Sequence, residues 1–455
     1  MRTEMKVPKQ VGSRGILSPT WLHEGYFAGT CADADPEVAA LIEGEYFRQA
    51  TSVELVASEN FVSRAVLEAQ GSVLTNKTVV GYPGRRFHAG AEYADALERV
   101  AIKRACQLFS CSYANVQPHS GIQANLAVFR ALMTPEDTVL SLSGEAGGHF
   151  SHGGPSNMSS DMAHAVFYGV CRDTGLIDYP QIENLGRKHR PKLIVAGGAA
   201  YPRVIDFPRL RAIADEVGAR LLVDIAHFAG LIVAGVYPNP FPHADVVTTT
   251  TYKSLRGARG GLILANDGTL AEALDRATVP GVQGSPLLHA VVGKAVCLGE
   301  ALRPEFATYG RAVLDNARTL ASSLMQGGID VLTAGTDTPL VIADLRRPGL
   351  KGQPLVESLD RAGITCNRCE IPFDQTDPAL TSGLRFGLSA CTTRGLGVED
   401  VAAIASWIIE LLAAHESGAD DIATLEADIR SRAAMRMASF PFYSTISTVT
   451  ERSVG

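Results

Sequence analysis

The chain has 455 residues, of which 46% are hydrophobic, and its mean hydropathy is +0.08, so it can bury enough apolar surface for two domains. Its net charge of −7 and the lack of a basic block give nucleic-acid binding no support. The first residues lack the apolar core of a signal peptide, and no stretch reaches membrane-spanning length. We therefore expect a cytoplasmic protein with no membrane or nucleic-acid partner.

In chain order, residues 1–45 are loop-rich apart from a helical stretch at 36–49, which predicts an N-terminal arm. From 46 to 305, short apolar runs alternate with helical patterns, and this alternation predicts a mostly parallel sheet covered on both faces. The expected strands are 138–141, 165–168, 193–196, 221–224, 246–249 and 261–264, with helices at 181–189 and 208–217 between them. This segment is the expected large domain.

A long helical connection is expected at 286–317. Short strands at 331–332 and 340–343 and an amphipathic helix at 401–415 follow it. These patterns predict a smaller α+β domain over residues 306–455.

The eight cysteines are scattered along the chain, which is typical of free thiols in a reducing compartment. Cys366 and Cys369 form a lone C-x-x-C pair. Because a second pair of ligands is missing, we expect no metal site there or elsewhere.

The most informative residues are an acid and a lysine at the ends of two expected strands. An apolar run, 221–223, ends in Asp224, and Lys253 follows four consecutive threonines. Functional side chains gather at the carboxyl ends of parallel strands, and a buried acid is costly unless a cation pairs with it. A pyridoxal phosphate site needs a lysine for a Schiff base and a carboxylate for the pyridinium nitrogen. Lys253 alone would be better interpreted as an exposed residue after an edge strand, but the acid-bearing strand favours a cofactor site.

Several longer motifs occur in an order that resembles one known family. They are the segments 54–61, 67–72, 81–84, 115–121, 226–230 and 248–261. Together they are similar to serine hydroxymethyltransferases, from about residue 36 to beyond 410. The resemblance implies an α/β, fold-type-I pyridoxal-phosphate-dependent transferase fold like that of aspartate aminotransferase. It also implies a homodimer whose active sites borrow residues from the partner, with a tetramer left open.

The resemblance assigns cofactor roles by matching motifs. It implies that Lys253 forms the Schiff base, that Asp224 pairs with the pyridinium nitrogen, and that His227 lies beside the phenolic oxygen. Ser120 and Gly121 resemble the phosphate cradle, because a hydroxyl and backbone N–H groups suit an anion. The remaining implied cofactor contacts are Thr250 and Tyr252, with Gly284 and Ser285 completing the cradle from the neighbouring subunit.

The substrate positions are assigned in the same way. Arg385 resembles the arginine that binds the carboxylate of the amino acid, a task that suits its planar fork. Ser58 matches another position that contacts the substrate. Without the resemblance, Arg385 would be read as an ordinary ion-pairing arginine.

The chain departs from the family pattern mainly around the expected substrate. Thr78 and Val80 stand where the family has a tyrosine and a glutamate, and the glutamate handles protons during hydroxymethyl transfer to tetrahydrofolate. A valine cannot act as a general acid or base. The other departures are Phe87-His88 for paired tyrosines, Ala146 for a stacking histidine, Tyr252 for a histidine, Cys369 for an asparagine, and Ile122 and Ala199 for serines.

The retained residues bind and activate an α-amino acid, whereas the lost ones largely handle folate. We therefore expect a folate-independent transaldolase that cleaves L-threonine to acetaldehyde and a glycine quinonoid. It would then add an acceptor aldehyde to give a new β-hydroxy-α-amino acid, in specialised metabolism such as that of nucleoside antibiotics. Thr78 and Val80 would open the pocket for a bulkier aldehyde. His88 is the candidate base, although it could instead fill space or bind the acceptor.

Other functions stay open at this point. The chain could be a serine or α-methylserine hydroxymethyltransferase that uses tetrahydrofolate, or a simple threonine aldolase. It could also be another pyridoxal enzyme or a non-catalytic relative. The sequence also leaves open whether His149 replaces the stacking ring lost at Ala146.

Overall fold

The computed structural model describes residues 21–23 and 25–443, which fall into two compact units. The first unit holds the described residues up to Ala50 together with Tyr443, and the second holds Thr51–Phe442. The first contains helix α1 (Cys31–Ala34) and most of helix α2 (Pro36–Thr51). Helix α2 confirms the helical stretch expected at 36–49 and runs past the arm boundary expected at residue 45. The part of the expected arm before residue 21 lies outside the described residues.

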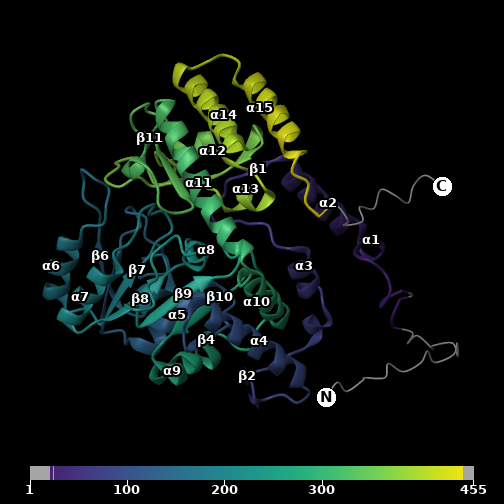
Figure 1. The fold of residues 1–455 in the computed structure, drawn as a ribbon, viewed down its shortest axis with the longest axis vertical. Helices are drawn as coiled ribbons and strands as arrows, with labels where there is room; N and C mark the ends of the chain where they lie inside the picture. The colour runs from purple at the N-terminus through teal and green to yellow at the C-terminus, as the bar shows by residue number, and fades with distance from the viewer. Residues whose placement is uncertain (1–20, 24, 444–455) are drawn as a thin grey trace. The chain divides into compact units, whose positions relative to one another are not determined.

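A seven-stranded sheet forms the centre of the second unit (Figure 1). Across the sheet its strands are β4 (Tyr113–Asn115), β10 (Gly261–Ala265), β9 (Val246–Thr250), β8 (Arg220–Asp224), β7 (Leu193–Ala196), β5 (Thr138–Leu142) and β6 (His164–Tyr168). Strands β9, β8, β7, β5 and β6 pair in parallel, and β10 and β4 are antiparallel to their neighbours. The mostly parallel sheet and all six strands expected in it are confirmed.

Helices cover both faces of this sheet, because its central strands are apolar on both sides. Along β8, Leu221 and Val223 belong to one core and Leu222 to the other, as period-two alternation requires. The helices of this part are α3 (Arg64–Gln70), α4 (Glu92–Phe109), α5 (Gly121–Leu132), α6 (Tyr179–His189), α7 (Phe207–Val217), α8 (Ala229–Val233), α9 (Ala271–Arg276) and α10 (Leu288–Ala301), with a hairpin of β2 (Gly81–Tyr82) and β3 (Arg85–Arg86).

A smaller sheet with its own core follows in the chain (Figure 1). Its strands lie in the order β11 (Asp330–Val331), β12 (Leu340–Asp344), β15 (Gly383–Gly387) and β14 (Asn367–Cys369). The accompanying helices are α11 (Glu305–Gln326), α12 (Gly352–Arg361), α13 (Ser389–Arg394), α14 (Val398–Ser417) and α15 (Ile422–Met437). Strand β1 (Val53–Glu54) pairs in parallel with β13 (Ile364–Thr365) in a separate two-stranded sheet, and Val53 and Ile364 pack in the smaller core. The domain boundaries expected at 46 and 305 stay predictions.

The long helix expected at 286–317 is instead two helices, α10 and α11, separated at residues 302–304. Pro304 explains the break, because proline lacks an N–H group and is tolerated only at the start of a helix. Helix α11 then continues to Gln326. Its first turns pack in the core of the large sheet through Phe306 and Val313, and its later turns pack in the smaller core through Leu320.

Two other expectations concern the whole chain. All eight cysteines are free thiols. Of the helices in the described residues, none combines the length and the apolar composition needed to cross a membrane.

Candidate active site

Two neighbouring parallel strands place the acid and the lysine of the candidate site. Asp224 is the last residue of β8 and pairs with Thr248 of β9, and Lys253 lies in the turn that follows β9. Gly197 directly follows β7, the strand on the other side of β8, and has a φ of +114°. A Cβ at Gly197 would lie 2.2 Å from the carbonyl oxygen of Asp224. Only glycine allows this close approach of the two strand ends. The carboxyl edge of the sheet therefore gathers the functional side chains, as expected.

These side chains line a cleft of about 340 Å³. The site residues expected from the sequence that lie in it are Ser58, Ser120, Gly121, Asp224, His227, Thr250, Tyr252, Lys253 and Arg385. Asn125, His149, Phe150 and Ile122 also line it. With Gly148, Gly198, Ala199 and Ala226, which complete the lining, the cleft unites residues from seven separated segments of the chain.

Asp224 is 8% exposed and fully hydrogen-bonded. Its Oδ2 accepts from Asn125 Nδ2 at 2.8 Å and lies 3.0 Å from His152 Nε2, and its Oδ1 accepts from the Ala226 N–H at 3.0 Å. Burial disfavours the charge of Asp224, but the hydrogen bonds from His152 and Asn125 outweigh burial and hold its pKa below the ordinary value. Asp224 is therefore an ionised carboxylate, the form that a pyridinium nitrogen requires.

Sequence reasoning missed Asn125 and His152, the two side chains that hold Asp224. A signal for Asn125 was present, because it lies four residues after Gly121 and so on the same face of helix α5. Its Oδ1 accepts from Thr248 Oγ1 at 2.6 Å, which directs its amide hydrogens towards Asp224. His152 could not be found in this way, because it lies in a loop and meets Asp224 only through the tertiary structure.

Lys253 is also buried, and its Nζ lies 3.2 Å from His227 Nε2. Burial lowers the pKa of Lys253 to about 8; Asp224 opposes this shift, and Arg385 and Arg259 reinforce it. Burial and the charge of Lys253 hold the pKa of His227 well below its ordinary value, so this imidazole is neutral. The lysine amine can therefore lose its proton near neutral pH, as attack on a carbonyl requires.

The Arg385 guanidinium lacks an acid partner among the described residues. Its Nη1 donates to the Ala199 carbonyl at 2.7 Å and its Nη2 to Asn367 Oδ1 at 3.1 Å, whereas its Nε is buried without a partner. Burial also lowers the pKa of Arg385. A half-buried cation whose buried Nε is unused is costly, and a carboxylate from a ligand would compensate it.

The N-terminus of α5 forms an anion cradle at another side of the cleft. Ser120 caps the helix, with its Oγ accepting from the Gln123 N–H at 3.2 Å, and Gly121 is the first helical residue. The hydroxyl of Thr250 is buried there without a partner. Exposed backbone N–H groups, the helix dipole and a spare hydroxyl suit a phosphate. The lysine, the carboxylate and this cradle fit pyridoxal phosphate.

His149 lies in the same cleft, and its hydrogen bonds define its tautomer. Its Nδ1 accepts from the Ser151 backbone N–H at 3.3 Å and lies 2.7 Å from Ser151 Oγ, so the proton of the neutral ring is on Nε2. Burial and His152 lower the pKa of His149 to about 4. Ala146 is buried in the core and does not line the cleft. His149 is thus a neutral donor.

Five expected site residues are not in the cleft of their own chain. Thr78 and Gly284 are exposed and Val80 and His88 are half-buried. His88 packs edge-on against Phe87, with the ring centroids 5.5 Å apart. The carbonyl oxygen of Ser285 lies 3.0 Å from His119 Nε2. The assigned roles of these five residues stay predictions.

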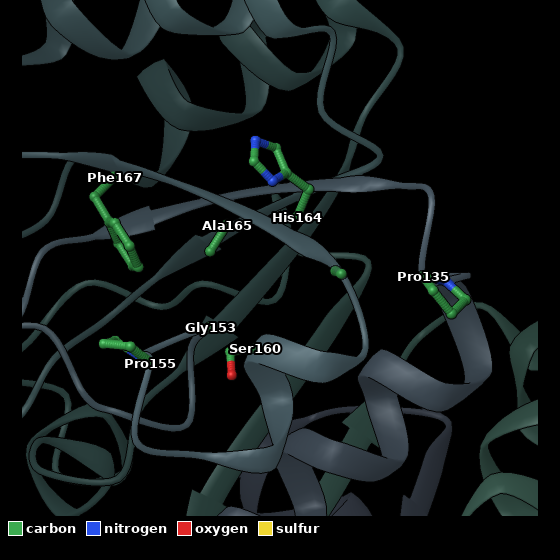
Figure 2. Close-up of a pocket in the computed structure, with 8 residues that line it drawn as sticks. Pro135, Gly153, Pro155, Ser160, His164, Ala165 and Phe167 are labelled. Carbon is green, nitrogen blue, oxygen red and sulfur yellow. The ribbon is translucent and has the colours of Figure 1, made fainter.

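A second hollow, of about 420 Å³, lies beside the edge strand β6 (Figure 2). Its lining includes His164, Ser160, Pro155 and Phe167, but no lysine, arginine or carboxylate. It lacks a lysine for a Schiff base and a carboxylate for a pyridinium nitrogen. The cleft with Lys253 is therefore the candidate active site, although this hollow is larger.

Comparisons with known proteins agree with the geometry of the cleft. The family model described as serine hydroxymethyltransferase matches residues 31–408. A serine hydroxymethyltransferase of Rhodospirillum centenum is 53% identical over 422 residues, which are 92% of this chain and 98% of the relative. A serine hydroxymethyltransferase of Paramagnetospirillum magneticum is 52% identical over 420 residues, which are also 92% of this chain and 98% of the relative. One of Ruegeria pomeroyi is 52% identical over 425 residues, 93% of this chain and 98% of the relative.

Proposed function

Because the chain belongs to the serine hydroxymethyltransferase family of pyridoxal-phosphate-dependent enzymes, we propose that it cleaves the Cα–Cβ bond of a β-hydroxy-α-amino acid. The preferred reaction transfers the hydroxymethyl group of L-serine or α-methylserine to tetrahydrofolate. Relatives that are about half identical over nine-tenths of the chain carry that enzyme name, and this supports hydroxymethyl transfer over the transaldolase expected from the sequence.

Pyridoxal phosphate, when bound, supplies the electron sink for breaking a bond at Cα. Lys253 would hold it covalently, since its lowered pKa leaves a neutral amine near pH 8. Asp224 would hold a proton on the ring nitrogen, because His152 and Asn125 keep this carboxylate ionised. Ser120, Gly121 and Thr250 would bind the phosphate.

Arg385 would bind and orient the amino acid. Its unused Nε and its lack of an acid partner in the described residues suit a substrate carboxylate, with Ser58 in the same cleft. A carboxylate bound there would lie in the cleft that Lys253 also lines. The combination of this unpaired arginine with Lys253 and Asp224 is the observation that carries the proposal.

A folate-independent L-threonine transaldolase is the second candidate. One specific observation favours it: Val80 stands where the resemblance expects a glutamate, and the segment 77–81 contains no carboxylate. His88 would then be the base, and L-threonine aldolase activity would result when no acceptor aldehyde is present. Either reaction would take place in a homodimer, which we infer from the position of the five expected residues outside the cleft of their own chain.

One experiment separates these functions. The holoenzyme is given L-serine or α-methylserine with tetrahydrofolate, and methylenetetrahydrofolate is measured. In parallel it is given L-threonine, with and without a panel of aldehydes, and acetaldehyde and new amino acids are measured. Folate-dependent turnover of serine or α-methylserine is expected to be the fastest reaction. Acetaldehyde release that rises with an added aldehyde, without folate-dependent turnover, would replace hydroxymethyl transfer by the transaldolase. Lys253→Ala is the control and should be inactive in every arm.

A further inference from the structure

Beneath the cleft, a buried lysine outside the catalytic set has only carbonyl oxygens around its amine. Lys294 lies on helix α10 and is 1% exposed. Its Nζ donates to the carbonyl oxygens of Val116, Pro118 and Gly261 at 2.7, 2.9 and 3.0 Å. No carboxylate of the described residues forms an ion pair with it. The charge of Glu98 does act on Lys294, but this carboxylate forms its ion pair with Arg86 and accepts a hydrogen bond from Gln117.

Three acceptors around one amine indicate its charge state. Only the ammonium form has three N–H donors, whereas a neutral amine has two and would turn its lone pair towards the third carbonyl. Burial lowers the pKa of Lys294 to about 7, and Cys297 and Glu98 act in the opposite direction. The carbonyl oxygens of Val116, Pro118 and Gly261, here called the carbonyl cage, therefore favour the ammonium form of Lys294. Its hydrogen bonds are all to main-chain oxygens. A ring of carbonyl oxygens is also how proteins replace the hydration shell of a dehydrated potassium ion.

The three carbonyls belong to the two loops that build the cofactor site. Val116 and Pro118 precede the phosphate cradle that begins at Ser120, and Gly261 is the first residue of β10, directly after the loop that carries Lys253. The Gly261 N–H also donates to the Pro118 carbonyl at 2.9 Å, so the loops meet directly beside Lys294. A charge at this point joins both loops to helix α10.

Helix α10 packs closely under the lysine loop. A Cβ at Gly260 would lie 2.2 Å from Lys294 Cε, and a Cβ at Gly257 would lie 2.1 Å from Cys297 Sγ. This packing leaves no room for an additional ion beside the lysine. The side chain itself therefore fills the place where an ion would otherwise be held.

We propose that Lys294 is a built-in monovalent cation, whose ammonium group takes the place of a potassium-sized ion in a carbonyl cage. Lys294 is a positioning residue: it holds the phosphate loop and the lysine loop together for cofactor binding. This role is independent of the substrate of the enzyme, so it stands or falls separately from the proposed function.

Chemical rescue tests the proposal. The dissociation constant for pyridoxal phosphate is measured by absorbance and fluorescence, at constant ionic strength, in potassium, ammonium or tetramethylammonium chloride. In tetramethylammonium, Lys294→Ala should bind the cofactor about tenfold more weakly or worse, as expected for the loss of charged hydrogen bonds. Potassium or ammonium should restore its affinity, because either ion can enter the vacated cage. Tetramethylammonium is too large to enter it.

Two controls make the result decisive. The wild-type enzyme should bind the cofactor equally well in all three salts. Lys294→Met keeps the apolar stem and fills the cage, so it should bind weakly in all three. Wild-type affinity that requires potassium, or a Lys294→Ala defect that no cation reduces, would overturn the proposal.

A second variant covers the case in which Lys294→Ala does not fold. Lys294→Gln offers two of the three donors, so it should bind the cofactor more tightly than Lys294→Met does. Equal losses in the Gln and Met variants would mean that Lys294 acts only by filling space, and the proposal would then be rejected.

Discussion

Three charged residues of the cleft differ in how their charge is compensated. Asp224 is satisfied within the chain by Asn125 and His152, so its ionised form exists before any ligand binds. Lys253 and Arg385 are not satisfied in this way, because the lysine faces a neutral histidine and the arginine keeps an unused buried donor. Unpaired charge away from solvent is costly, so we expect the cofactor and the substrate carboxylate to bind at these two residues.

The lowered pKa of Lys253 predicts how cofactor capture depends on pH. Below pH 8 the amine is protonated and has no lone pair for attack on the aldehyde, so capture by the apoenzyme should accelerate as pH rises, with a midpoint of about 8. Stopped-flow absorbance of the Schiff-base band measures this rate. Arg259→Gln removes a nearby positive charge and should move the midpoint upward. Arg256→Gln is the matched control and should leave it in place; a midpoint close to that of free lysine would contradict the prediction.

Replacing Arg385 by lysine should separate substrate binding from cofactor binding. The lysine keeps the charge but loses the planar fork, so KM for the amino acid should rise roughly 10- to 1000-fold while cofactor absorbance stays unchanged. Steady-state kinetics and a cofactor titration measure the two effects. Arg368→Lys, at an exposed position on the neighbouring strand β14, is the control and should change neither. An unchanged KM in Arg385→Lys would remove Arg385 from the substrate site.

At the scale of elements, the cradle depends on how closely helix α5 approaches strand β9. A Cβ at Gly121 would lie 2.7 Å from Thr250 Cγ2, which is closer than ordinary contact. The first turn of the helix can therefore reach the strand end only because residue 121 is glycine. This contact sets the distance between the backbone N–H groups of α5 and the hydroxyl of Thr250.

A double-mutant cycle tests this contact. Gly121→Ala should weaken cofactor binding by pushing α5 away from β9. Thr250→Ser keeps the hydroxyl and removes the methyl group that would clash, so the double variant should recover most of the lost affinity. Equilibrium titration with pyridoxal phosphate measures all four proteins. Strictly additive losses would show that the methyl contact does not determine the cradle.

At the scale of the whole molecule, the cleft of one chain holds nine of the fourteen expected site residues. The resemblance assigned Gly284 and Ser285 to the neighbouring subunit, and neither lies in the cleft of its own chain. The proposed homodimer, in which each subunit completes the cradle of the other, would account for this arrangement.

Complementation between two inactive variants tests the shared site. Lys253→Ala lacks the Schiff-base lysine, and Gly284→Asp places a carboxylate where the phosphate of the partner would lie. Each variant alone should be inactive. After unfolding and refolding together in equal amounts, half of the dimers would contain one intact site, so about a quarter of wild-type activity should return. No recovery, with mixed dimers verified by mass spectrometry, would contradict a cradle shared between subunits.

The sequence by itself determined the parallel sheet, its six expected strands, and the positions of Asp224 and Lys253 at strand ends. These features follow from local patterns: apolar runs of strand length, and polar residues directly after them. It did not indicate that a single proline divides the expected helical connection, or that β1 pairs with β13 in a separate two-stranded sheet.

Only the tertiary structure decided which side chains compensate the charges of the cleft. His152 reaches Asp224 across 72 residues and Lys294 reaches Val116 across 178 residues, and no local pattern encodes such distant contacts. The same holds for the unpaired Nε of Arg385, because a missing partner becomes visible only when all the neighbours are in place. Periodicity reports which face of an element is buried, whereas hydrogen bonding and charge compensation depend on packing between elements.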